Sequence, residues 1–143
     1  MSCLSRHRIC CATLLLLLQA NTHAELSVIV SAKRAPIKLA QDDVAKLFLA
    51  KTTTFPDGLR ALPVDQSSGT PARDLFITKV LDKSESQLKA YWSRVVFTGV
   101  GTPPKEVGGD NEVKKLVAEN PNLIGYIDKS KLDNSVIAVM SIE

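Results

Sequence analysis

The positions of cysteine and histidine place the strongest constraint on how this chain can fold. All three cysteines and both histidines lie within the first 23 residues of the 143-residue sequence. Without that segment, the chain can form no disulfide, no thiol or imidazole nucleophile and no histidine- or thiolate-based zinc site. We therefore expect no cofactor and no metal, and a fold held together by its core alone. About 120 residues suffice for one such core.

The N-terminal segment has the pattern of a secretory signal peptide. Arg6 and Arg8 form a positive region, and residues 9–18 form a short apolar run. We expect residues 1–24 to be removed and residues 25–143 to form the folded domain. The apolar run is too short for a stable membrane anchor, since a spanning helix needs about 20 apolar residues. The sequence therefore predicts export, with a periplasmic location.

The charge of the remaining chain is nearly balanced. Loss of the first 24 residues leaves 16 Lys and Arg against 15 Asp and Glu, a net charge of +1. Proteins that bind nucleic acids or membrane surfaces normally carry a basic patch or run. We therefore expect neither as a partner.

Hydrophobic patterning predicts one α/β domain, with a sheet of about four strands flanked by about four helices. The expected strands are residues 26–31, 61–64, 123–127 and 136–142, and the expected helices are residues 41–50, 70–81, 84–95 and 110–119. In these helices we expect Tyr91 and Trp92 to be core residues, Leu116 to face inward and Asp110 to act as a cap. The glycine- and proline-rich residues 98–109 are long for a loop, which indicates a functional or mobile segment.

The stretch 61–81 carries the most concentrated ligand chemistry. An apolar strand leads into a turn, and Thr70-Pro71 is a strong helix start, because threonine caps the helix and proline loses no hydrogen bond there. Free N–H groups, the helix dipole and small hydroxyl side chains would meet at this turn and could hold an anion. The alternative, a well-capped corner that binds nothing, stays open on local chemistry alone.

Several segments in order carry a family resemblance. They are LAQDDVAKLFLAK, TFPDG, PVDQSSGT followed by Phe76, AYWSRVVFTG, GTPP and VKKLVAENPNLIGYID. Together they resemble the small, single-domain members of the phosphate ABC-transporter substrate-binding protein family, over residues 26–139. The resemblance implies a single-lobe, periplasmic-binding-protein-like domain with a mixed sheet. In longer members, phosphate lies between this lobe and a second one, which we expect this chain to lack.

The resemblance also implies a set of site residues. Ser68, Gly69 and Thr70 match the family's Ser-Gly-Thr motif and would donate hydrogen bonds to the anion. Asp65 or Gln66 falls near the acidic residue that accepts from a protonated phosphate oxygen. The candidate ligand-binding residues are Asp65, Gln66, Ser67, Ser68, Gly69, Thr70 and Arg73.

One charged residue of the family pattern is missing. The family's arginine falls on Val64 in this sequence. Arg73, on the first turn of the following helix, is either its replacement or a solvated surface residue, and the sequence leaves both possibilities open.

Two functions follow from these observations. The first is an exported protein that binds phosphate or a similar oxyanion in association with ABC-type transport, with a transporter permease as partner. The second is a periplasmic interaction module that has the fold without tight ligand binding and docks on a transporter, sensor or other envelope protein. We do not expect an enzyme, because Ser67 and Ser68 have no histidine base.

Overall fold

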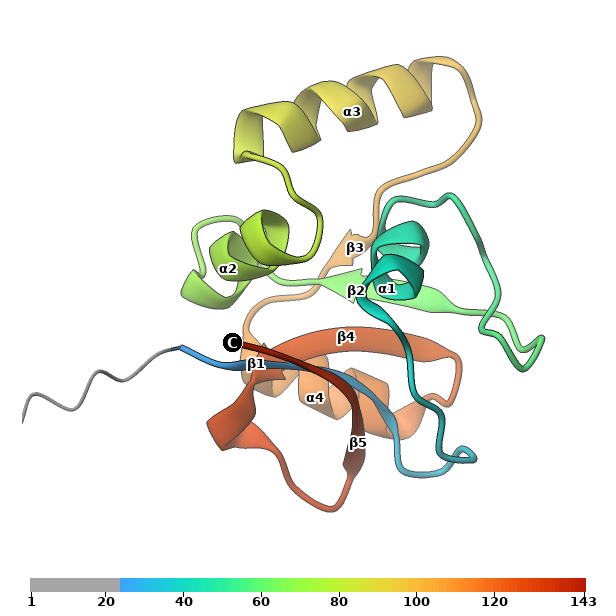
Figure 1. Ribbon diagram of the computed structural model, residues 1–143, viewed down its shortest axis with the longest axis vertical. Helices are drawn as coiled ribbons and strands as arrows, with labels where there is room; N and C mark the ends of the chain where they lie inside the picture. The colour runs from blue at the N-terminus through green and yellow to red at the C-terminus, as the bar shows by residue number, and fades with distance from the viewer. Residues whose placement is uncertain (1–23) are drawn as a thin grey trace, which may run out of the picture.

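The computed structural model describes residues 24–143, so the predicted signal peptide lies outside the described residues except for Ala24 (Figure 1). The described chain forms one five-stranded sheet with the order β3-β2-β4-β1-β5. Its strands are β1 (Leu26–Ser31), β2 (Leu62–Asp65), β3 (Lys105–Glu106), β4 (Leu123–Asp128) and β5 (Val136–Ile142). The helices are α1 (Gln41–Phe48), α2 (Pro71–Lys79), α3 (Glu85–Phe97) and α4 (Asp110–Glu119), with a 3₁₀ turn at Lys129–Lys131.

The sheet is mixed, as expected. β1 pairs antiparallel with both β4 and β5, whereas β2 runs parallel to β4 and to β3. The α/β class and the four predicted strands are confirmed. The fifth strand, β3, was missed because it has only two residues, both charged and exposed, within the predicted loop.

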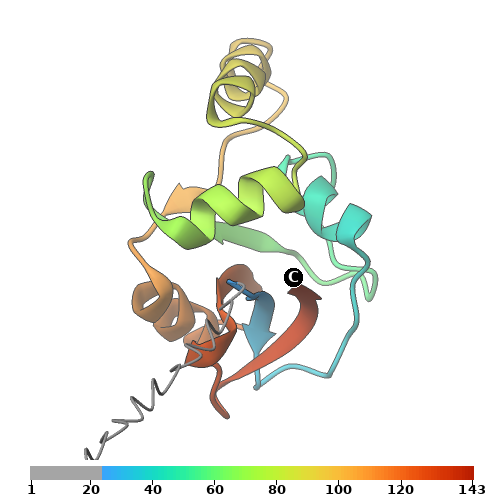
Figure 2. The same ribbon diagram turned by 60° about the vertical axis from the view of Figure 1, so that its left-hand side comes forward.

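Side chains of β1 point alternately to the two faces of the sheet, and helices cover both faces. Val28 and Val30 point into a core cluster that includes residues of α1 and α2, whereas Ile29 belongs to the cluster beneath α4. All six residues of β1 are buried, as a strand covered on both faces requires. Figure 2 shows α1 and α2 on one side of the sheet and α4 on the other.

The packing of α4 corrects two expectations. Val113 and Val117 are fully buried, but Leu116 is 38% exposed, because it lies one residue off the stripe that faces the sheet. The helix is capped at Gly109, whose N–H donates to Glu112 Oε2 at 3.0 Å. Asp110 is instead the first helical residue.

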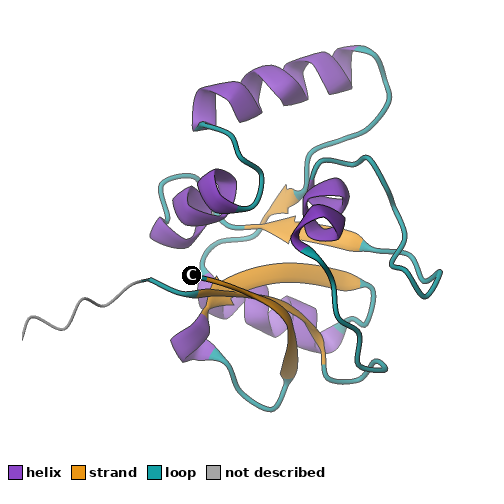
Figure 3. Ribbon diagram, viewed as in Figure 1, coloured by secondary structure: helices purple, strands orange, loops and turns teal. Residues whose placement is uncertain are grey.

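Helix α3 stands away from the sheet (Figure 3). Leu88 is buried, and Tyr91 donates a hydrogen bond to the carbonyl of Leu49 at 2.6 Å. Tyr91 and Trp92 are half-buried at the edge of the core rather than inside it. Near the C-terminal end of α3, Phe97 is 91% exposed.

Gly125 in β4 allows α4 to approach the sheet. A Cβ atom there would lie 2.5 Å from Cγ1 of Val113 and 3.1 Å from Cγ2 of Val64. The distance to Val113 is shorter than real Cβ contacts, so a side chain at this position would push α4 away from the strand.

We therefore expect Gly125→Ala to lower the free energy of unfolding by about 1–3 kcal/mol, as overpacking of a core typically does. Urea denaturation measures this loss. In a Val113→Ala background, which removes the clashing methyl groups, the same glycine substitution should cost less. An equal cost in both backgrounds would show that the contact with Val113 is not what requires glycine.

Candidate functional site

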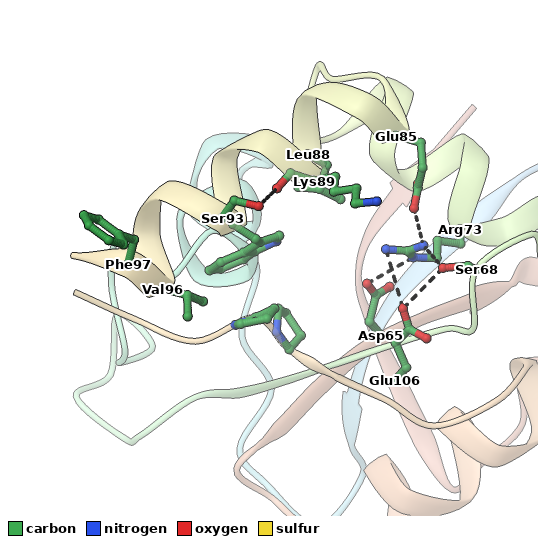
Figure 4. Close-up of a pocket in the computed structure, with 13 residues that line it drawn as sticks. Asp65, Ser68, Arg73, Glu85, Leu88, Lys89, Ser93, Val96, Phe97 and Glu106 are labelled. Carbon is green, nitrogen blue, oxygen red and sulfur yellow. Dashed lines mark hydrogen bonds and ion pairs between the residues drawn. The ribbon is translucent and has the colours of Figure 1, made fainter. Parts of the chain in front are cut away.

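The guanidinium of Arg73 is the centre of the candidate site. The residue is 6% exposed, so the possibility of a solvated surface arginine is excluded. Its Nε donates to Asp65 Oδ2 at 3.2 Å, and its Nη1 donates to Ser68 Oγ at 2.7 Å and to Glu85 Oε1 at 2.8 Å. Nη2 lies 3.8 Å from Glu106 Oε1 (Figure 4). One buried cation is therefore surrounded by three carboxylates.

Asp65 is the last residue of β2, and its carboxylate orients the guanidinium of Arg73. It is 9% exposed and accepts hydrogen bonds from the Tyr126 hydroxyl and from the backbone N–H of Gln66. Burial raises the pKa of Asp65, and the Tyr126 hydrogen bond and the charge of Arg73 offset only part of that rise. Burial, together with the neighbouring Asp65 charge, also raises the pKa of Tyr126, which remains a hydrogen-bond donor.

The turn after β2 has the predicted helix start. Thr70 is the N-cap of α2, its Oγ1 accepts from the backbone N–H of Arg73 at 3.3 Å, and Pro71 is the first helical residue. Gly69 has a φ of 88°, a conformation that other residues rarely adopt. The N–H of Ser67 donates to the carbonyl of Gly108 at 2.8 Å, which ties the turn to the segment after β3.

Some donors at this turn are available to a ligand. Among residues 24–143, no acceptor is hydrogen-bonded to the backbone N–H groups of Ser68, Gly69 or Ala72. Ser68 and Gly69 are exposed. These groups lie at the N-terminal end of α2, where the helix dipole favours negative charge.

A groove of about 670 Å³ opens from Arg73 along α3. Its polar end contains the cations Arg73 and Lys89 and the three carboxylates already described. The rest of its lining is mostly apolar: Leu88, Trp92, Val96, Phe97, Pro103 and Pro104, with Ser93 among them. Figure 4 shows α3 along one side of this groove.

Five of the seven candidate residues line two separate places, and Ser67 and Gly69 line neither of them. Asp65, Ser68 and Arg73 line the groove, whereas Gln66 and Thr70 line a separate hollow of about 250 Å³. Gln66 is 1% exposed, and its Nε2 donates to Asp110 Oδ1 at 2.7 Å and to the Tyr126 carbonyl at 3.0 Å. The side-chain amide of Gln66 is therefore bonded to other protein groups in the interior and does not line the groove.

Sequence reasoning missed four groups of this site: Tyr126, Glu85, Glu106 and Lys89. They come from β4, α3 and β3, and no sequence spacing relates them to Arg73. Only Tyr126 could have been suspected from the sequence, because a tyrosine in a buried strand needs a hydrogen-bond partner for its hydroxyl.

Two further properties concern the described part of the chain. It contains no group of three or more His, Cys, Asp and Glu side chains arranged to hold a metal ion. None of the helices between residues 24 and 143 has the length and apolar character needed to cross a bilayer.

Comparison with known proteins identifies the fold. No family model and no curated protein matches the sequence. Among solved structures, one from Clostridium perfringens is described as a phosphate ABC transporter substrate-binding protein with bound phosphate. It is 24% identical with a TM-score of 0.65, over 81% of this chain and 45% of its own.

Two other structures agree with it. An ABC-type phosphate transport receptor from Vibrio cholerae gives a TM-score of 0.60 at 15% identity, over 81% of this chain and 46% of the receptor. PstS from Borrelia burgdorferi gives a TM-score of 0.59 at 14% identity, over 80% of this chain and 47% of PstS. This chain thus spans about half the length of the proteins it matches.

The fold is therefore that of one lobe of a periplasmic-binding-protein-like domain. The resemblance to phosphate ABC-transporter substrate-binding proteins, indicated by the sequence motifs, is confirmed at the level of the fold. The compared structures are described as transport proteins, not as enzymes.

The hydrogen bond from Tyr126 to Asp65 gives a pH-dependent prediction. We expect Tyr126→Phe to lower the free energy of unfolding by about 1–3 kcal/mol at neutral pH, because an ionised buried carboxylate loses a donor. Without that donor, Asp65 takes up a proton at a higher pH than in the wild-type protein. The difference in free energy of unfolding between the wild-type protein and the variant should therefore narrow as pH falls through the raised pKa of Asp65 in the variant.

The matched control is Tyr91→Phe, which loses a hydrogen bond to a backbone carbonyl with no titrating partner. Its difference in free energy of unfolding from the wild-type protein should stay constant with pH. Denaturation curves collected from pH 8 down to about pH 4, near the ordinary pKa of aspartate, measure both variants. A difference in unfolding free energy for Tyr126→Phe that does not change over this range would contradict this account of Asp65.

Proposed function

We propose that this protein is an exported, non-catalytic solute-binding domain that binds phosphate or a similar oxyanion at Arg73. The observation that carries the proposal is the buried guanidinium beside the N-terminal end of α2, hydrogen-bonded to Ser68. The fold is shared with proteins whose descriptions name phosphate, which supports the same ligand class.

The anion would take the place of two carboxylates. The side chains of Glu85 and Glu106 are 56% and 48% exposed, so both can rotate into water and leave N–H groups of Arg73 free. Asp65 would stay in place, because its side chain is buried and held by Tyr126. The hydroxyl of Ser68 would supply further contact, and so would the backbone N–H groups of Ser68 and Gly69. We assign Thr70 an indirect role, as the cap that holds this end of α2.

The open site sets the expected strength of binding. Charged contacts exposed to water contribute about 0–1 kcal/mol each, and the existing carboxylates compete for the same donors. We therefore expect millimolar affinity for phosphate in the isolated domain. A second lobe, from a partner or another copy, would be needed for tight capture.

We also propose that the protein acts outside the cytoplasm, beside a transporter. Residues 1–24 act as a cleaved signal peptide, residues 25–143 form the periplasmic domain, and an ABC transporter permease is the partner.

An exposed apolar patch favours the second candidate function, a docking module. Val96 is 52% exposed, Phe97 91% and Val100 75%. Large apolar side chains gathered on a surface often mark a protein contact. Capture of a transporter or sensor component from periplasm by the wild-type domain, and not by a Phe97→Ser variant, would support this function.

Calorimetric titration tests the proposed anion site. We expect phosphate to bind the wild-type domain, Ser68→Ala to weaken binding, and Glu106→Gln to strengthen it roughly two- to fivefold by removing a competing charge. Glu119→Gln, on an exposed residue at the far end of α4, makes the same change in net charge and should leave affinity nearly unchanged.

Two results would count against the proposal. Absence of detectable heat with phosphate, sulfate and carboxylates at millimolar concentration would exclude independent anion capture. Weaker binding by Glu106→Gln would show that this carboxylate contacts the ligand rather than competing with it.

A further inference from the structure

The groove beside Arg73 is much larger than an inorganic oxyanion. Its volume of about 670 Å³ falls in the range of roughly 300–1,000 Å³ that is typical of pockets for organic ligands. Phosphate at Arg73 would occupy only the polar end. We propose that the natural ligand is an organic oxyanion, such as a phosphate monoester, whose apolar group lies along α3; this rests on the proposed anion site.

The walls of the groove suit an apolar group. On one side, α3 presents Leu88, Trp92 and Val96, which recur at helical spacing from its first turn to its last. On the other side lie Pro103 and Pro104, which come just before β3. A flexible chain or ring between these walls would lose contact with water without leaving a polar group unpaired.

The arrangement of charge orients such a ligand. Lys89 lies on α3 between the polar and the apolar parts, and Figure 4 shows its side chain extending toward Arg73. In the described range, Lys89 forms no salt bridge, unlike Arg73, which forms three. A negative head group would therefore lie between Arg73 and Lys89, whereas a positive one would be repelled from this junction.

The chain offers a direct reporter of the apolar part. Trp92 is its single tryptophan and lines the groove, so tryptophan emission responds to a ligand that binds beside it. Ethyl, butyl and hexyl phosphate do not absorb in the tryptophan range. Fluorescence and calorimetry can therefore follow the same titrations, with inorganic phosphate, 1-hexanol and hexylammonium as the comparison probes.

We expect affinity to rise with chain length, so that hexyl phosphate binds at least tenfold more tightly than inorganic phosphate. Full burial of one methylene is worth roughly fourfold in affinity, and an open groove gives less. Neither 1-hexanol nor hexylammonium should bind comparably, because each lacks the negative head group.

Two surface substitutions locate the effect. Val96→Ser removes an apolar group from the groove and should reduce the dependence on chain length while leaving inorganic phosphate unaffected. Val100→Ser is the matched control, because Val100 is also exposed but lines a different hollow and not this groove. Both residues lie on the surface, so neither change threatens the fold.

The outcomes separate this inference from the proposed function. If inorganic phosphate binds and the alkyl phosphates bind no better, the organic ligand is excluded while the anion site stands. If no anion binds, both fail. If hexylammonium or 1-hexanol binds as well as hexyl phosphate, the groove selects an apolar or cationic ligand, and the inference is overturned.

Discussion

The buried contact between Arg73 and Asp65 is the interaction on which the rest of the site depends. Asp65 ends β2, Arg73 lies on the first turn of α2, and Tyr126 reaches the same carboxylate from β4. Breaking such a pair by removing one partner typically costs about 3–5 kcal/mol, because the other charge stays buried and unpaired. The contact therefore fixes the helix, the turn and the sheet relative to one another.

The same contact prepares the guanidinium for a ligand. Asp65 holds one edge of Arg73, so the remaining N–H groups point toward the groove without further ordering. Glu85 and Glu106 occupy those groups from exposed positions and can be exchanged. A buried partner combined with exposed ones that a ligand can replace gives a cation that is already fixed in place, which lowers the cost of binding.

Much of the fold could be predicted from the sequence, because local patterns determine it. The buried run of β1, the Thr70-Pro71 start of α2 and the Ser84–Gln87 capping box each specify one element without reference to the rest. Leu116 was placed wrongly because a helical stripe can be assigned one residue off when several apolar residues adjoin. Strand β3 has no pattern of its own and exists only through its pairing with β2.

The site was predictable only in part. Thr70 capping and the positive φ of Gly69 follow from the turn chemistry, and the family motif pointed to Ser68. The burial of Arg73 did not follow, because it requires Tyr126, Glu85 and Glu106 to converge from elements far apart in the sequence. The interior role of Gln66 likewise depends on Asp110, which lies 44 residues away.

The most direct test of the account is an NMR titration of the labelled domain with phosphate. It would follow the Nη–H groups of Arg73, which Glu85 and Glu106 release, and the backbone N–H groups of Ser68 and Gly69. We predict that these resonances shift together along one saturable curve. Saturable shifts elsewhere in the domain, with these three unchanged, would contradict it.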